Sequence, residues 1–123
     1  NGVSKLFFVL DFSNFETQAK AIIDCIENPN STVQHISMVS LDYCDMYKDK
    51  IHQTFSEIEK ILKGTRVPYT IFRIGLPMQF LSACILRRSK LVAFPCTEGN
   101  VNWIDLLDLA EIIVSVLLDD SSQ

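Results

Sequence analysis

The sequence predicts an α/β fold in three layers, with a mainly parallel sheet flanked by helices. Short, nearly all-apolar runs rich in strand-forming residues, such as residues 5–10, suit strands that are buried on both faces. Segments with apolar residues at helical spacing follow these runs, and the two patterns alternate along the chain. With 123 residues, four glycines and four prolines, the chain is long enough for one compact domain, which we place at residues 1–123.

Residues 5–26 predict the first strand and the first helix. The strand covers residues 5–10, and the Ser13-x-x-Glu16 spacing that follows is typical of a capping box at a helix start. Apolar side chains then recur at helical spacing and form one face: Phe15, Ala19, Ile22, Ile23 and Ile26. The turn-forming residues 28–31 end this helix.

The same pattern repeats farther along the chain. A second strand is predicted at residues 33–39, and residues 41–48 form a polar connection. The next helix has one apolar face, made of Ile51, Phe55, Ile58 and Leu62. We expect Gly64 to close this helix in the left-handed conformation that glycine adopts without strain.

The last part of the chain continues the alternation. Residues 67–73 predict a third strand, in which Pro68 is tolerated because it lies near the start. The remaining segments are a helix at residues 77–88, a short strand at residues 91–94, an extended piece at residues 101–104 and a final helix. Asp105 or Asp108 caps the final helix, whose apolar face is Leu109, Ile112, Ile113, Val116 and Leu117. Residues 119–123 are expected to be a frayed tail.

Charge and hydropathy argue against two classes of partner. The net charge of −4 gives no general attraction to nucleic acid or to anionic membrane. The nearest basic cluster is Arg87, Arg88 and Lys90, which also suits the negative end of a helix dipole. No apolar run approaches the roughly 20 residues of a membrane helix, and no secretory signal opens the chain. We therefore expect a cytoplasmic protein with no nucleic-acid or membrane partner.

The four cysteines predict neither a metal site nor a disulfide scaffold. They are widely spaced and contain no C-x-x-C pair, at Cys25, Cys44, Cys84 and Cys96. Cys25 and Cys84 lie within apolar helical stretches, so we expect buried, reduced thiols that pack as small hydrophobic residues.

Ligands of a doubly wound sheet bind beyond the carboxyl ends of its strands. Residues 11–13, 40–42 and 73–78 occupy such positions here, each between a predicted strand and a helix. The usual chemistry is missing, because glycines at positions 2, 64, 75 and 99 cannot form a G-x-G-x-x-G turn or a Walker A loop. No tyrosine is followed four residues later by lysine, which excludes the Tyr-x-x-x-Lys pair of short-chain dehydrogenases.

The two histidines and Arg73 are the remaining candidates for a binding role. His35 and His52 have no second ligand at metal spacing, so we expect neither to bind a metal. Arg73 ends an otherwise apolar strand and must reach solvent or a carboxylate. A salt bridge at the sheet edge and a binding role are equally compatible with its position.

Residues 67–75 read Val-Pro-Tyr-Thr-Ile-Phe-Arg-Ile-Gly and resemble a segment of the NmrA-like family that usually reads Y-T-I-L-R-P-G. Residues 18–24, 35–40 and 57–62 resemble the family's preceding helix, strand and second helix. Downstream, residues 95–118 are similar to a longer family pattern, with Asp105, Asp108, Ala110 and Glu111 in register. Nearly the whole chain therefore resembles the carboxy-terminal part of an NmrA-like domain, an atypical short-chain dehydrogenase with a Rossmann-type NAD(P)-binding fold.

The resemblance implies a partial Rossmann-like domain and a set of contact residues. The glycine turn and the ribose-reading residue of the family would lie upstream, so we expect a fragment of a larger protein or a remnant without that half. The implied cofactor contacts are Asp11, Phe12, Ser40, Leu41, Arg73, Ile74, Gly75 and Leu76, and the implied substrate-side residues are Pro77, Met78 and Phe80. Ile74 replaces the family's proline, and Phe80 stands where asparagine is common. Ile51 and Phe55 align with the catalytic tyrosine and lysine, so we predict no catalytic residue and no metal ligand.

Three functions follow as expectations from this resemblance. The first is a redox-sensing or regulatory member, or a fragment of one, in which the full-length protein binds NADP or NAD and this chain alone binds neither. The second is a non-catalytic interaction or assembly subunit, whose exposed sheet edge pairs in a homo-oligomer, with a missing amino-terminal half or with another protein. The third is part of an NAD(P)H-dependent oxidoreductase that is inactive as this chain alone.

Overall fold

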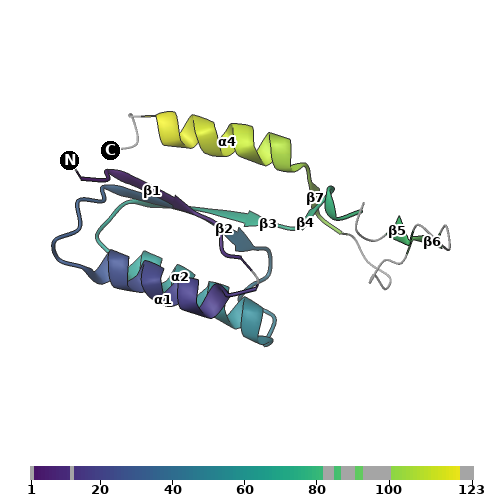
Figure 1. Ribbon diagram of the computed structural model, residues 1–123, viewed down its shortest axis with the longest axis horizontal. Helices are drawn as coiled ribbons and strands as arrows, with labels where there is room; N and C mark the ends of the chain where they lie inside the picture. The colour runs from purple at the N-terminus through teal and green to yellow at the C-terminus, as the bar shows by residue number, and fades with distance from the viewer. Residues whose placement is uncertain (1, 12, 82–84, 87–90, 93–100, 120–123) are drawn as a thin grey trace. The chain divides into compact units, whose positions relative to one another are not determined.

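The computed structural model describes residues 2–11, 13–81, 85–86, 91–92 and 101–119. The chain divides into two compact units, with the boundary between Arg73 and Ile74. The predicted α/β class is confirmed, because parallel strands are flanked by helices (Figure 1). The prediction of a single domain stays a prediction.

The first unit contains a three-stranded sheet with the order β1-β2-β3. The strands are β1 (Lys5–Phe8), β2 (His35–Leu41) and β3 (Tyr69–Ile74), and their arrows point the same way in Figure 1. β1 and β2 are parallel, and β3 joins β2 through a 2.9 Å hydrogen bond from the Ile36 N–H to the Pro68 carbonyl. The strands begin or end one to two residues away from the predicted bounds, which periodicity alone does not fix.

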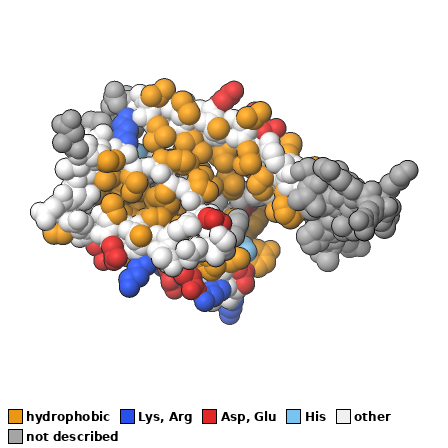
Figure 2. All heavy atoms as spheres, viewed as in Figure 1, with side chains coloured by type: hydrophobic (Ala, Val, Ile, Leu, Met, Phe, Trp, Pro, Cys, Tyr) orange, Lys and Arg blue, Asp and Glu red, His pale blue; other side chains and the backbone are white. Residues whose placement is uncertain are grey.

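Two helices, α1 (Phe15–Glu27) and α2 (Lys50–Gly64), cover one face of this sheet (Figure 1). The buried cluster between the layers consists of Leu10, Ala19, Ile36, Met38, Cys44, Phe55, Ile58 and Leu62. Charged side chains gather over the outer side of the two helices (Figure 2), as expected of amphipathic helices. Removing each large apolar side chain from water contributes about 1.5–3 kcal/mol, so this cluster is the main source of stability in the unit.

The capping box predicted at Ser13 is wrong. Asn14 is the residue before α1, and its side chain makes no capping hydrogen bond. The Ser13 N–H and hydroxyl donate to the Asp11 carboxylate, at 2.9 and 2.8 Å, so Asp11 has taken the group that would have capped the helix. Glu16 pairs with Lys50 of α2 instead of turning back to the helix start.

Two further expectations for the helices are wrong. Gly64 is the last residue of α2 and is not left-handed; the chain leaves through Thr65 in an extended conformation (φ −76°), whose N–H donates to the Ile61 and Leu62 carbonyls. Cys25 is exposed. It directly precedes Ile26, which lies on the packed face, and each residue turns a helix by about 100°.

The start of α2 has a side-chain cap that the sequence analysis did not identify. The Asp49 carboxylate accepts hydrogen bonds from the N–H groups of Ile51 and His52, at 3.1 and 3.2 Å. The same carboxylate contacts His52 Nδ1 at 2.5 Å. His52 therefore helps to fix the start of this helix.

The second unit contains two short strand pairs and α4 (Leu106–Leu118). β4 (Leu76–Pro77) is parallel to β7 (Trp103–Ile104), and β5 (Ile85–Leu86) is antiparallel to β6 (Leu91–Val92). Asp105 caps α4 by accepting a 2.8 Å hydrogen bond from the Leu107 N–H, which confirms one of the two predicted caps. No helix in the described part of the chain is long and apolar enough to cross a membrane.

The helix predicted at residues 77–88 is wrong at both ends. Pro77 belongs to β4, where the N–H groups of Leu76 and Met78 donate to the carbonyls of Asn102 and Ile104. Residues 85–86 form β5, because their backbone groups pair with β6. Several predicted features lie outside the described residues: Phe12, Cys84, the cluster of Arg87, Arg88 and Lys90, residues 93–94, Cys96 and residues 120–123 of the tail.

Gly75 lies close to the backbone of a neighbouring segment in the second unit. A β-carbon at this position would overlap the backbone carbonyl of Asn102, the residue before β7. At Gly64, by contrast, a β-carbon would meet no atom within 4 Å. Of these two glycines, only Gly75 is required by its contacts.

We predict that Gly75→Ala destabilises the protein by about 1–3 kcal/mol, because backbone must shift to accept the methyl group. Gly64→Ala is the matched control, and we expect it to be neutral or to stabilise by up to about 1 kcal/mol, since alanine favours a helix. Urea unfolding of both variants measures the difference. An unchanged unfolding midpoint for Gly75→Ala would contradict the close approach to Asn102.

Candidate functional site at the carboxyl ends of the strands

The carboxyl ends of the parallel strands gather the predicted contact residues of the first unit at one edge. Asp11 follows β1, Ser40 and Leu41 end β2, and Arg73 lies near the end of β3. The other predicted contacts, residues 74–78 and Phe80, belong to the second unit. Phe12 lies outside the described residues.

Glu59 of α2 is the centre of a charged cluster at this edge. Its side chain is 2 % exposed, although an ionised carboxylate is costly to bury without partners. Arg73 supplies a bidentate pair: Nε donates to Oε1 at 2.9 Å and Nη2 donates to Oε2 at 2.6 Å. Such fork-to-fork pairing is the strongest arrangement available between these side chains.

Three further side chains donate hydrogen bonds to the Glu59 carboxylate. The Ser40 hydroxyl donates to Oε1 at 2.7 Å, and the Cys44 thiol donates to the same oxygen at 3.2 Å. Lys63 Nζ, one helical turn after Glu59, donates to Oε2 at 3.3 Å. The cluster therefore connects α2 to the end of β2, to the end of β3 and to the loop that follows β2.

These hydrogen bonds set the protonation states of the cluster. Burial raises the pKa of Glu59, but the donors Arg73, Ser40, Cys44 and Lys63 outweigh it and lower the pKa to about 2. The hydrogen bonds to Glu59 raise the pKa of Arg73. Burial raises the pKa of the Cys44 thiol, and Glu59 raises it further. At neutral pH the cluster thus holds a carboxylate, a guanidinium and a neutral thiol, and such a thiol is a poor nucleophile.

Arg73 forms the salt bridge that the sequence analysis left open. Its third nitrogen, Nη1, lies 3.4 Å from Asp45 Oδ1, so the guanidinium bridges Glu59 and the loop after β2. The Ser40 hydroxyl is fully buried and donates its hydrogen bond to Glu59. A cofactor role for Arg73 and Ser40 stays a prediction, and it would have to use their backbone or the exposed side of the guanidinium.

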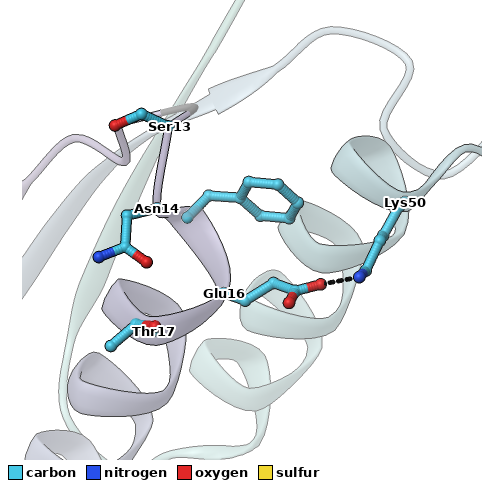
Figure 3. A pocket seen from close by; sticks show the side chains of 6 residues that line it. Ser13, Asn14, Glu16, Thr17 and Lys50 are labelled. Atoms are coloured by element: carbon cyan, nitrogen blue, oxygen red, sulfur yellow. Dashed lines mark ion pairs between the residues drawn. The ribbon is translucent and has the colours of Figure 1, made fainter.

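Asp11 is exposed and lies at the start of α1. Hydrogen bonds from the Ser13 N–H and hydroxyl lower the pKa of its carboxyl group. An open cavity of about 200 Å³ lies at this end of α1 (Figure 3) and is lined by Ser13, Asn14, Phe15, Glu16, Thr17 and Lys50. The Glu16–Lys50 ion pair crosses one wall of the cavity, so the only lysine in the lining already has a partner.

The positions aligned with a catalytic tyrosine and lysine lie in the hydrophobic layer. Phe55 is 3 % exposed within the buried cluster, and Ile51 packs against that cluster. Neither side chain carries a transferable proton. These two positions therefore contribute packing.

The predicted substrate-side residues lie in the second unit, at the end of β4 and just after it. Met78 and Phe80 are 47 % and 42 % exposed, and Pro77 is half-buried. Gln79 between them donates to Asp105 Oδ1 at 2.8 Å and accepts from the Leu106 N–H at 3.2 Å. The segment is thereby tied to the helix start, with two apolar side chains left facing outward.

The sequence analysis missed Glu59, although a signal for it was present. Phe55, Ile58, Glu59 and Leu62 share one helical stripe, and all four are buried. A carboxylate within an apolar stripe requires a cation, and Arg73 was expected to reach either solvent or a carboxylate.

His35 is held as expected of a structural histidine, with Nε2 3.1 Å from Thr70 Oγ1. Over the described residues, no three His, Cys, Asp or Glu side chains lie together as a metal site requires.

Comparison with known proteins gives one informative likeness. No family model and no curated protein sequence matches the chain. The structure of triphenylmethane reductase from Citrobacter sp., studied for the bioremediation of triphenylmethane dyes, is similar with a TM-score of 0.71 and 23% sequence identity. The likeness covers 98% of this chain and 44% of that chain, so this chain spans less than half the length of that reductase. The chain shares the reductase's fold over that part.

We predict that Arg73→Met destabilises the protein by about 3 kcal/mol, because Glu59 is left as a buried charge without its main partner. The double variant Glu59→Met/Arg73→Met is expected to be more stable than Arg73→Met, since it leaves no buried charge. Lys63→Ala is the control at the same carboxylate; its ammonium is half exposed, so the loss stays below about 1 kcal/mol. Urea unfolding of the four proteins measures these values, and equal stability of the single and double variants would contradict the prediction.

The lowered pKa of Glu59 predicts acid sensitivity with a defined sign. The pKa of Glu59 is about 2 in the folded state, whereas its ordinary value is 4.5. The stabilisation that comes from the ionised carboxylate is therefore complete above pH 4.5 and is lost as the pH falls toward 2. Between pH 6 and pH 3 this group accounts for about 2 kcal/mol of lost stability. Unfolding free energies measured across this range should fall less steeply for Glu59→Gln. Identical slopes would show that other carboxylates account for the acid sensitivity.

Proposed function

We propose that this chain is the substrate-side half of an NmrA-like, Rossmann-type NAD(P)-binding domain, and that it serves redox sensing or regulation rather than turnover. Two findings support the first part: the motif resemblance along nearly the whole chain and the shared fold over 98% of it. The observation that carries the second part concerns the aligned catalytic positions: Phe55 is buried in the hydrophobic cluster, and Ile51 packs against that cluster.

The side chains at the sheet edge favour binding over proton transfer. Bound NAD(P)H would supply a hydride, and its reduction partner would still need a proton from the protein. Phe55 has none to give, and the Ser40 hydroxyl is fully buried and committed to Glu59. Asp11 is ionised and exposed, so it is suited to accept hydrogen bonds from ribose hydroxyl or carboxamide groups. Its negative charge does not suit a phosphate.

A second candidate function, an assembly subunit, is favoured by the edge of the sheet at β1. β1 has β2 on one side, and no strand among the described residues pairs with its other side. Phe7 and Val9 are 37 % and 59 % exposed along this segment. An unpaired, apolar edge invites another strand, from a second copy, from an amino-terminal half or from another protein.

We predict that the full-length gene product containing this chain is stabilised by NADPH or NADH without oxidising it. A ligand at a hundred times its dissociation constant adds about 2.7 kcal/mol to the unfolding free energy. Thermal unfolding with each cofactor measures binding, and absorbance at the nicotinamide band measures turnover with a quinone or a triphenylmethane dye as acceptor.

Each outcome of this experiment decides between the candidates. Stabilisation with turnover would make the protein part of a reductase and overturn the regulatory role. No stabilisation by either cofactor would overturn cofactor binding. If size-exclusion chromatography of the same sample then shows an oligomer, the assembly function is favoured, whereas a monomer would contradict it.

A further inference from the structure

The last helix, α4 (Leu106–Leu118), is apolar over most of its circumference. Ten of its 13 residues are apolar, and the other three are Asp108, Glu111 and Ser115. These three recur at a spacing of three and four residues and therefore share one polar stripe. A helix that packs against a single layer needs one apolar stripe about 100° wide, and the apolar residues of α4 extend well beyond that width.

Two apolar stripes of α4 face different directions. Leu109 and Ile113 are buried, at 6 % and 7 % exposure. Leu107, Val114 and Leu118 are 72 %, 51 % and 75 % exposed, and their spacing of seven and four residues aligns them along the helix. Two residues turn a helix by about 200°, so Leu107 points away from Leu109. Since burial of one stripe leaves the other in water, the exposed stripe is a candidate interface.

Acidic side chains border the exposed stripe. Asp108 and Glu111 lie one and four residues after Leu107, and neither forms an ion pair within the described part of the chain. Residues 101–123 carry Asp or Glu at positions 105, 108, 111, 119 and 120 and contain no lysine or arginine. The last turn of α4 holds no basic residue, although the negative end of a helix dipole favours one. This surface therefore lacks cations along its side and at its end.

A helix suits this surface better than a strand. The backbone groups of α4 are bonded within the helix, so α4 offers no hydrogen-bonding edge to an added strand. Leu118 lies 11 residues after Leu107, about 16 Å along the axis, which is the length of three helical turns. Ala110 is exposed on the same stripe, and a small side chain lets two helices approach closely.

The charges of α4 select among the helices that could cover the stripe. A second copy of this chain would bring its own acidic border against Asp108 and Glu111, and like charges across an interface repel. The same charges disfavour an anionic membrane surface. A helix with lysine or arginine beside its apolar stripe would pair with both carboxylates, and a cation beyond Leu118 would meet the negative end of the helix dipole.

We propose that the exposed stripe of α4, formed by Leu107, Ala110, Val114 and Leu118, docks a basic amphipathic helix of another protein. The apolar side chains of that helix pack on the stripe, and its lysine or arginine side chains pair with the acidic border. The inference goes beyond the proposed function, because it assigns a partner surface in the second unit and involves no cofactor.

The probe is a dye-labelled synthetic helix of leucine and lysine with its leucines at helical spacing, and the charge control is the same peptide with glutamate in place of each lysine. Fluorescence anisotropy with the full-length gene product should show one saturable site for the lysine peptide and much weaker binding of the glutamate peptide. Leu107→Gln and Leu118→Gln, which keep a good helix former, should each weaken binding about tenfold through lost apolar burial. Met46→Gln changes a 71 % exposed side chain in the first unit and should leave the affinity unchanged.

A charge reversal tests the acidic border. Glu111→Lys should weaken binding of the lysine peptide and strengthen binding of the glutamate peptide, each by about two- to fivefold. Glu27→Lys makes the same change at an exposed position at the end of α1, so it is the matched control and should alter neither affinity.

Melting temperatures separate binding from folding. Because the substituted side chains are exposed, the variants should melt at the temperature of the unchanged protein. The absence of a saturable site, equal affinity for the two peptides, or unchanged affinity in Leu107→Gln/Leu118→Gln would each overturn the proposal. So would a dimer in sedimentation velocity that this double variant converts to a monomer, because a second copy would then cover the stripe. The cofactor experiment measures nicotinamide binding and turnover, so either proposal can fail without the other.

Discussion

The ion pair between Glu59 and Arg73 joins the layers of the first unit at the edge where ligands of α/β sheets bind. One carboxylate receives hydrogen bonds from β3, from β2 and from the loop after β2, and it sits on a helix whose neighbouring side chains are apolar. Burial disfavours the ionised form of Glu59, but its donors together outweigh that effect. The position of α2 along the sheet and the course of the loop both depend on this balance.

The same interaction limits the chemistry of the edge. Open α/β sheets ordinarily present polar side chains at the carboxyl ends of their strands to a ligand. Here the Ser40 hydroxyl and two nitrogens of Arg73 are directed inward to Glu59, and the raised pKa of Cys44 keeps its thiol neutral. The edge retains an exposed Asp11 and backbone groups. Such a surface can recognise a ligand more readily than it can transfer a proton.

Local pattern predicted the elements whose determinants are local. The helical spacing of Phe55, Ile58 and Leu62 gave α2, and an apolar run gave β1, since these signals lie within one segment. The helix expected at residues 77–88 failed because Leu76 and Met78 bond to residues 102 and 104, and nothing within the segment reports a partner so far along the chain. The capping box failed for a different reason: the nearby Asp11 carboxylate accepts the hydrogen bonds of the Ser13 N–H and hydroxyl.

Of the two residues of the central ion pair, the sequence analysis singled out Arg73 but not Glu59. The place of Arg73 in an apolar strand predicted that it reaches solvent or a carboxylate, but the choice of Glu59 depends on how α2 lies over the sheet. Apolar packing alone would fix that register weakly, because hydrophobic contacts are not directional. A guanidinium and a carboxylate bonded through two parallel hydrogen bonds are satisfied in one arrangement only. A shift of α2 by one turn would bring Lys63 to the place of Glu59 and set two cations against each other, so the pair excludes that register as well as stabilising the observed one.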